Sequence, residues 1–127
     1  MSIKDLVVSS KGLLEETLEA VVRDFFKYDE DGEILIVNKG FWKLTGEKKI
    51  LRYLAAAAGR KFLGIDVPDL GFDNAQISKG LNMKHNSVRG HLSQLRTKGL
   101  VKTEKGKSYV TIQGLHELLE KEGEGNA

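Results

Sequence analysis

The fold of this chain is decided by one stretch near its centre, which reads DNAQISKGL (73–81), NMK (82–84) and HNSVRGHLSQLRTKG (85–99). Asp73, followed three residues later by Gln76, has the form of a capping box, in which two side chains satisfy backbone N–H groups at the start of a helix. Ala75, Ile77 and Leu81 are the candidate inward residues of that helix. The pattern therefore predicts a short helix that ends in a tight turn at residues 82–84.

A longer helix is expected immediately after the turn, over residues 85–98. Val88, Leu92 and Leu95 recur at intervals of four and three residues, so they share one face of a helix. Gly99 stands where glycine commonly follows the end of a helix. The segment contains no aspartate or glutamate, so we expect its polar face to carry no negative charge.

Two strand-like segments follow and predict a hairpin. Residues 100–103 and 107–112 contain β-branched and aromatic side chains, and Gly106 lies in the turn between them. Leucines then recur over residues 113–122, where we expect a final short helix.

The segment before the central stretch predicts another helix, from Thr45 to about Gly59. Thr45 is a suitable N-cap, and Glu47 in the first turn complements the helix dipole. A run of four alanines also favours helix. Residues 64–72 are expected to form a loop, in which Gly71-Phe72 is a candidate for a brief strand pairing.

The N-terminal third predicts a helix followed by a hairpin. The helix is expected to begin near Lys11, because apolar residues recur at four, three and four positions: Leu14, Leu18, Val21 and Phe25. Asp31-Gly32 is a hairpin-turn dipeptide, and residues 33–37 after it are strongly strand-like. A further strand is expected over residues 41–44, with Trp42 in the core.

Four segments carry a resemblance to a known family: AQISKGL (75–81), NSVRGHLSQL (86–95), KGLV (98–101) and YVTIQG (109–114). They resemble the winged helix-turn-helix family of small bacterial, archaeal and viral transcription regulators. In that family the second helix of the pair enters the DNA major groove, and the hairpin after it is the wing. The first 44 residues have no counterpart in the resemblance.

The expected architecture is mainly α with a small antiparallel sheet, in the α+β class. We expect a winged helix-turn-helix domain over residues 45–121. Residues 1–44 form a helix and hairpin extension, used for packing or for dimerisation, and residues 122–127 form a disordered acidic tail.

Charge is distributed unevenly along the chain, although the formal net charge is only +2. Residues 46–113 carry thirteen basic and five acidic side chains, whereas residues 1–45 carry six basic and nine acidic ones. Residues 114–127 carry one basic and four acidic side chains. A basic centre between acidic ends is expected when the central part of a chain contacts a polyanion, although a solvated lysine-rich surface has the same charge pattern.

The resemblance and the charge together predict binding to double-stranded DNA and a role in transcription regulation. Asn86, Arg89, Ser93 and Gln94 are the candidates for base edges, with Arg89 suited to guanine. Gly90 either allows close approach of the helix backbone to DNA or is a packing glycine. The full set of expected DNA contacts is Lys79, Asn86, Ser87, Arg89, Gly90, Ser93, Gln94, Arg96, Thr97, Lys98, Lys102, Lys105 and Lys107.

Two interpretations stay open for the N-terminal stripe. Leu14, Leu18, Val21 and Phe25 either pack on the rest of the chain or form a homodimer interface, as two-fold DNA sites require. The acidic N-terminal segment is also a candidate surface for a protein partner. The alternative function is a winged helix used for protein contacts in a transcription or other multiprotein complex, which would need an exposed apolar patch.

Several other classes of function are not expected. The chain has no cysteine, and its three histidines show no metal-ligand spacing, so we expect neither a metal nor a cofactor. It shows no nucleophile–base arrangement and no glycine-rich phosphate loop, so we do not expect an enzyme. No apolar run is long enough for a membrane helix or a signal peptide, and we expect a cytoplasmic protein with no membrane contact.

Overall fold

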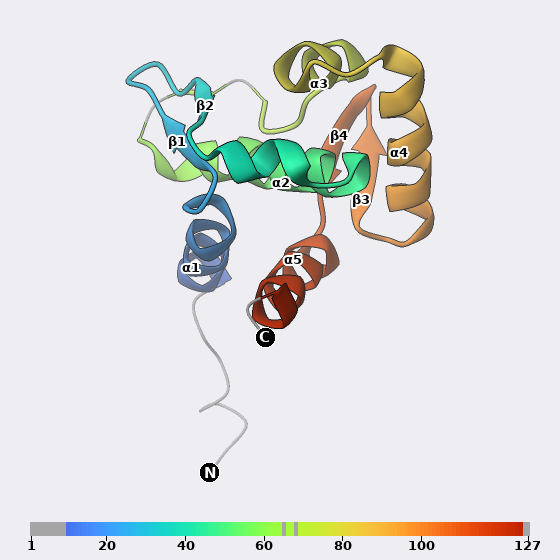
Figure 1. Cartoon of the computed structure of the whole chain (residues 1–127). Coiled ribbons are helices and arrows are strands. Elements are labelled where there is room, and N and C mark those ends of the chain that lie inside the picture. The colour runs from blue at the N-terminus through green and yellow to red at the C-terminus, as the bar shows by residue number, and fades with distance from the viewer. Residues whose placement is uncertain (1–9, 65, 68, 126–127) are drawn as a thin grey trace.

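The structure is a computed structural model that describes residues 10–64, 66–67 and 69–125, without the side chains of 10–14 and 121–125 (Figure 1). The elements are α1 (Ser10–Val22), β1 (Phe26–Tyr28), β2 (Ile34–Ile36), the 3-10 helix η2 (Lys39–Lys43), α2 (Gly46–Gly59), the 3-10 helix η3 (Arg60–Phe62), α3 (Asn74–Leu81), α4 (His85–Thr97), β3 (Val101–Glu104), β4 (Lys107–Val110) and α5 (Ile112–Gly125). The described chain is mainly helical with two small antiparallel hairpins, which confirms the expected mixture of helices and antiparallel strands.

Local capping explains where α3 and α4 begin and end. The Asp73 carboxylate accepts from the Gln76 N–H at 2.8 Å, and the Asp73 N–H donates to the Gln76 side chain at 2.9 Å, so the predicted capping box is confirmed. Asn82 follows α3 in the left-handed conformation, with φ 52°. At the end of α4, Gly99 has φ 76° and the Leu100 N–H donates to the Leu95 carbonyl at 3.0 Å, as in a Schellman motif.

The hairpin of β3 and β4 follows α4 directly. Its register pairs Val101 with Val110 and Thr103 with Ser108. Phe72 exchanges two backbone hydrogen bonds with Ser108, at 2.8 and 3.2 Å, so the loop before α3 adds a single bridge to the free edge of β4. The brief pairing predicted for Gly71-Phe72 is therefore confirmed.

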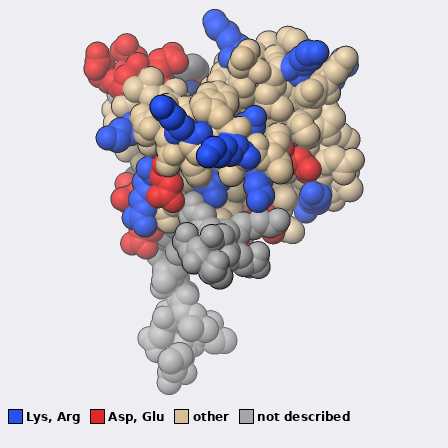
Figure 2. All heavy atoms as spheres, viewed as in Figure 1, with Lys and Arg blue, Asp and Glu red and all other residues tan. Residues whose placement is uncertain are grey.

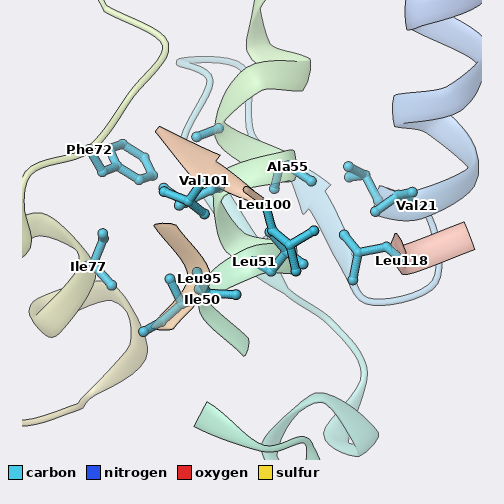
Figure 3. Packing of buried hydrophobic residues seen from close by; sticks show 14 of the residues in the cluster. Val21, Ile50, Leu51, Ala55, Phe72, Ile77, Leu95, Leu100, Val101 and Leu118 are labelled. Atoms are coloured by element: carbon cyan, nitrogen blue, oxygen red, sulfur yellow. The ribbon is translucent and has the colours of Figure 1, made fainter. Parts of the chain in front are cut away.

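One hydrophobic core joins all parts of the described chain (Figure 3). Its centre is α2, whose Ile50, Leu54 and Ala55 are at most 1% exposed. Figure 1 shows α2 crossing the middle of the molecule, with α1 and α5 below it and α4 beside it. The Thr45 side chain caps α2 at the Lys48 N–H, as predicted. The described part of the N-terminal extension therefore shares one core with the rest of the described chain. This core fixes the positions of α3, α4 and the hairpin that follows them.

Arg52 contributes to the contact between α1 and α2. It is buried, at 6% exposed, and its Nη1 donates to the Val21 carbonyl oxygen at 3.3 Å. Its guanidinium also lies 4.8 Å from the centre of the Phe25 ring. A buried cation needs such polar and aromatic contacts, because its desolvation is costly.

The first hairpin was predicted correctly from the sequence, but the segment after it was not. Phe26–Tyr28 pairs with Ile34–Ile36 across the predicted turn. Residues 41–44 were expected to form a strand, whereas the structure has η2 there, because the Asn38 side chain accepts from the Gly40 N–H at 2.9 Å and starts a helical turn. Phe41 enters the core at 0% exposed, and Trp42 stays 47% exposed, so the expected burial of Trp42 is wrong.

The C-terminal boundary also differs from expectation. α5 continues to Gly125, so residues 122–125 belong to a helix and not to a disordered tail; residues 126–127 lie outside the described part. No helix within the described residues is both long and apolar enough to cross a membrane.

Candidate nucleic-acid interface

The two faces of α4 differ sharply in burial. Val88, Leu92 and Leu95 face the core and are at most 2% exposed. The opposite face is open to solvent and has only polar, basic or small side chains. Its exposed members include every residue of α4 that the sequence assigns to DNA: Asn86, Ser87, Arg89, Gly90, Ser93, Gln94, Arg96 and Thr97. We call these eight residues the α4 outer face.

Two hydrogen bonds order side chains on the α4 outer face. Arg89 donates from Nη2 to the Asn86 Oδ1 at 2.7 Å, which joins two of the four candidates for base recognition. The Thr97 hydroxyl donates to the Ser93 carbonyl oxygen at 3.0 Å. A Cβ added at Gly90 would meet nothing within 4 Å, so packing inside the protein does not require glycine at this position.

The β3–β4 hairpin flanks one side of α4. Arg96 donates from Nη1 to the Thr103 Oγ1 at 3.2 Å, and Thr103 also contacts Ser108 at 3.3 Å. Lys105 and Gly106 form the hairpin tip with φ 51° and 80°, as a type I′ turn requires. Thr103 and Lys105 are exposed, so both remain accessible beside α4.

The other two predicted lysines of the hairpin lie on its opposite face. Side chains alternate along a strand, so Lys102 and Lys107 point away from the face that carries Thr103. The Lys102 Nζ is 3.7 Å from the Glu104 carboxylate, and the Lys107 Nζ is 3.2 Å from that of Asp69. The structure therefore does not bring Lys102 and Lys107 together with the α4 outer face.

Asp69 is the centre of a small network behind the hairpin, which the sequence analysis missed. It accepts from the Tyr109 hydroxyl at 2.6 Å and from the Gly71 N–H at 3.0 Å, besides its ion pair with Lys107. The hydrogen bond from Tyr109, followed by that from Gly71, lowers the pKa of Asp69 to about 2. Asp69 thereby ties the loop before α3 to β4. No local sequence signal identifies this contact, because the partners are far apart in the chain.

The first turn of α2 flanks the other side of α4. His91 packs against Gly46 so closely that a Cβ at Gly46 would collide with the imidazole. The Lys98 Nζ lies 3.1 Å from the Glu47 carboxylate, so this predicted phosphate contact already has an acidic neighbour. α4 is therefore bordered by two elements, the hairpin at Arg96 and the start of α2 at His91 and Lys98.

The N-terminal end of α4 and the C-terminal part of α3 also face solvent. Lys84 occupies the N-cap of α4 and makes no side-chain capping bond. Lys79, the predicted contact on α3, is exposed. Both lysines place positive charge at the ends of the α3–α4 connection.

The residues proposed for dimerisation lie in α1 and just after it, and not on α4. Leu18 and Val21 are 2% and 0% exposed within the single chain, and Phe25 is half-buried beside Phe41. Leu14 lies in α1, but its side chain is outside the described part. The burial of Leu18 and Val21 fits the intramolecular interpretation of the stripe.

A second basic surface was not anticipated. Figure 2 shows lysine and arginine side chains gathered in the middle of the face of the molecule that it draws, over η2 and α2. The members from residues 39–49 are Lys39, Lys43, Lys48 and Lys49, together with the exposed Trp42. The Lys49 Nζ lies 5.8 Å from the centre of the Trp42 ring. We call these five residues the Trp42 surface. Its sequence signal was the close spacing of four lysines around a tryptophan.

Comparison with known proteins gives no match: no family model, no curated protein and no solved structure matches this chain. The part of the chain that the structure describes also contains no group of three or more His, Cys, Asp or Glu side chains able to hold a metal ion.

Proposed function

We propose that this protein binds double-stranded DNA as a winged helix-turn-helix transcription regulator. In this proposal α4 lies in the major groove, and the tip of the β3–β4 hairpin lies on the adjacent backbone or in the minor groove. The observation that carries the proposal is the α4 outer face, which is exposed over its whole length and has no acidic side chain. A helix that meets stacked base pairs between two rows of phosphates needs that combination.

The order of elements supports the proposal. α2, the bridge at Phe72, α3, α4 and the β3–β4 hairpin follow one another in the order of a winged helix-turn-helix. Three residues connect α3 to α4, and the hairpin contacts α4 through Arg96 and Thr103. α4 and the hairpin tip can therefore meet one ligand together.

Base recognition is assigned to four side chains of α4. The Arg89 guanidinium has the forked geometry that pairs with O6 and N7 of guanine. Asn86 suits adenine, and its hydrogen bond with Arg89 reduces the freedom that both side chains lose on binding. Ser93 and Gln94 complete the set of candidates for base edges.

Backbone contacts are assigned to the edges of α4 and to the hairpin tip. Ser87, Arg96 and Thr97 border the base-reading residues and suit phosphate oxygens. Lys105 is the hairpin lysine best placed for a phosphate or the minor groove, because Lys102 and Lys107 lie behind the hairpin beside acidic groups. Lys79 extends the expected contact to α3.

A protein-binding role for α4 has less support. The exposed large apolar side chains of the described residues are Leu35, Val37, Trp42, Leu63 and Ile112, and none of them lies on α4. A protein partner would thus use another surface. Leu35 and Val37 on the first hairpin, 44% and 52% exposed, fit the proposed N-terminal contact best.

The decisive experiment is a titration of labelled random-sequence duplex with the purified protein over a salt series, followed by selection of bound sequences. We expect the logarithm of the binding constant to fall steeply with the logarithm of salt concentration, by about 0.9 per phosphate contacted. We expect the selected DNA sequences to share a motif at the base pairs that α4 contacts. The absence of binding at low salt would refute the proposal, and a steep slope without a motif would replace regulation by sequence-neutral DNA binding.

A further inference from the structure

One end of the Trp42 surface, at the first turn of α2, adjoins α4 on the side opposite the hairpin. Lys48 and Lys49 belong to the first turn of α2, which contacts α4 at His91 through Gly46 and at Lys98 through Glu47. The hairpin contacts α4 at Arg96 instead. With about 100° per residue, Arg96 and the pair of His91 and Lys98 fall on opposite flanks of the helix.

A helix in the major groove has a sugar–phosphate backbone on each side, because the groove is only about 12 Å wide. In the proposed complex the hairpin tip contacts one of these two backbones. The start of α2 lies on the side of α4 where the second backbone would run. The Trp42 surface carries four lysines, of which Lys39 and Lys43 are exposed and Lys48 and Lys49 are half-buried. Glu47 forms an ion pair with Lys98, and Lys48 lines a pocket together with Asp24, Glu47 and Glu117.

We infer that the Trp42 surface contacts the sugar–phosphate backbone of the bound duplex, on the side of α4 opposite the hairpin. This inference rests on the proposed DNA binding and extends its footprint to residues 39–49. Lys43, Lys48 and Lys49 supply charge to phosphate oxygens. The indole N–H of Trp42 is a hydrogen-bond donor without acceptor capacity, which suits a phosphate oxygen, and its ring can pack on a sugar.

The composition of the surface favours nucleic acid over a membrane. Membrane-surface segments combine basic residues with a continuous apolar face that enters the lipid. Here one tryptophan stands among four lysines, and its neighbour Phe41 is committed to the core at 0% exposed. The cation–π contact between Lys49 and Trp42 keeps the charge and the ring side by side, so one ligand can meet both.

Trp42 makes the inference directly measurable, because it is the single tryptophan of the chain. We would record tryptophan emission and acrylamide quenching of the full chain during titration with duplex DNA, and follow binding separately through a label on the DNA. We expect emission to change and acrylamide quenching to fall in parallel with binding. A parallel titration uses vesicles of phosphatidylserine and phosphatidylcholine.

Two double variants, each of which removes two positive charges, test the lysines. Lys48→Ala/Lys49→Ala removes two charges from the Trp42 surface, and Lys27→Ala/Lys61→Ala removes two exposed charges elsewhere. We expect the first variant to lower the salt slope by about 2, because each lost phosphate contact lowers it by about 1. The second variant is expected to keep the wild-type slope.

The outcomes separate this inference from the proposed function. If DNA binds and Arg89→Ala weakens it, while Trp42 stays quenchable and both lysine variants behave alike, the inference is wrong and the proposed function stands. If Arg89→Ala has no effect but Lys48→Ala/Lys49→Ala lowers affinity, the groove assignment of α4 is wrong and the Trp42 surface remains a DNA contact. A response of Trp42 to vesicles but not to DNA would overturn the inference in favour of a membrane surface.

Discussion

The α4 outer face and the outer face of the β3–β4 hairpin both carry basic side chains without obvious partners in the sequence. In the structure the two arginines of the α4 outer face form hydrogen bonds with neutral side chains: Arg89 with Asn86, and Arg96 with Thr103. On the hairpin, Lys102 and Lys107 lie beside the carboxylates of Glu104 and Asp69. The sign of a residue's charge therefore does not tell whether that charge is available to a ligand.

Substitution of Arg89 on the α4 outer face should weaken DNA binding more than the other single substitutions. Arg89→Ala should weaken binding to the preferred duplex by about 1–3 kcal/mol and relax the selected sequence, because a bidentate pair to a base would be lost. Titration of labelled duplex and repeated sequence selection measure both effects. The control is Arg23→Ala, which removes another exposed arginine, just after α1. Equal losses from the two variants would show that only net charge matters.

Gly90→Ala should change stability and DNA affinity in opposite directions. Alanine should stabilise α4 by about 1 kcal/mol relative to glycine. The added methyl group meets no protein atom within 4 Å, so it creates no internal clash. If the helix backbone approaches DNA closely at this point, affinity falls while the unfolding midpoint in urea rises. Unchanged affinity would remove Gly90 from the interface.

The two faces of the hairpin can be compared through Lys105 and Lys107. Lys105→Ala should reduce the salt slope of binding by about 1 and weaken binding to every duplex similarly, as expected for a phosphate contact. Lys107→Ala should change the slope less, since its charge is already shared with Asp69. Salt series on both variants with one duplex make the measurement. A larger effect at Lys107 would reverse our assignment of the two faces.

Acid should weaken the contact behind the hairpin. The pKa of Asp69 is lowered to about 2, chiefly by the Tyr109 hydroxyl, from an ordinary value of about 3.9. A carboxyl whose pKa is lower in the folded state stabilises the fold above its unfolded pKa, and this contribution is lost as the pH falls toward the folded pKa. Asp69→Asn should therefore reduce the free energy of unfolding near neutral pH, and its difference from wild type should shrink between pH about 4 and 2. Urea unfolding at several pH values checks this; a difference independent of pH would mean that the charge of Asp69 has no stabilising role.

Much of the central fold could be predicted because its signals are local. The capping box at Asp73, the cap at Thr45 and the end of α4 at Gly99 each depend on residues within a few positions of one another. The apolar spacing of Val88, Leu92 and Leu95 likewise identified the buried side of α4. Once that side is known, the exposed side follows from helix geometry.

The segment around Trp42 shows where such prediction failed. Apolar and aromatic residues at 41–44 suggested a strand, but the choice between strand and helical turn depended on Asn38, which caps Gly40 and also donates to the Asp24 carbonyl at 3.0 Å. That arrangement places Phe41 in the core and leaves Trp42 outside. Which of two adjacent aromatic rings is buried depends on how the segment docks against α1 and the first hairpin.

The amino-acid sequence alone was enough to predict α2, α3 and α4, the turn that joins α3 to α4 and the acid-free polar side of α4, because these features arise from contacts within one or two turns of the chain. The tertiary structure alone brought Lys107 and Lys98 to their carboxylate neighbours. Asp69 reaches Lys107 and Glu47 reaches Lys98 across long stretches of chain, and their separations depend on how α2, α4 and β4 pack. Electrostatic interactions depend on distance in space, and that distance is set by the common core rather than by sequence spacing.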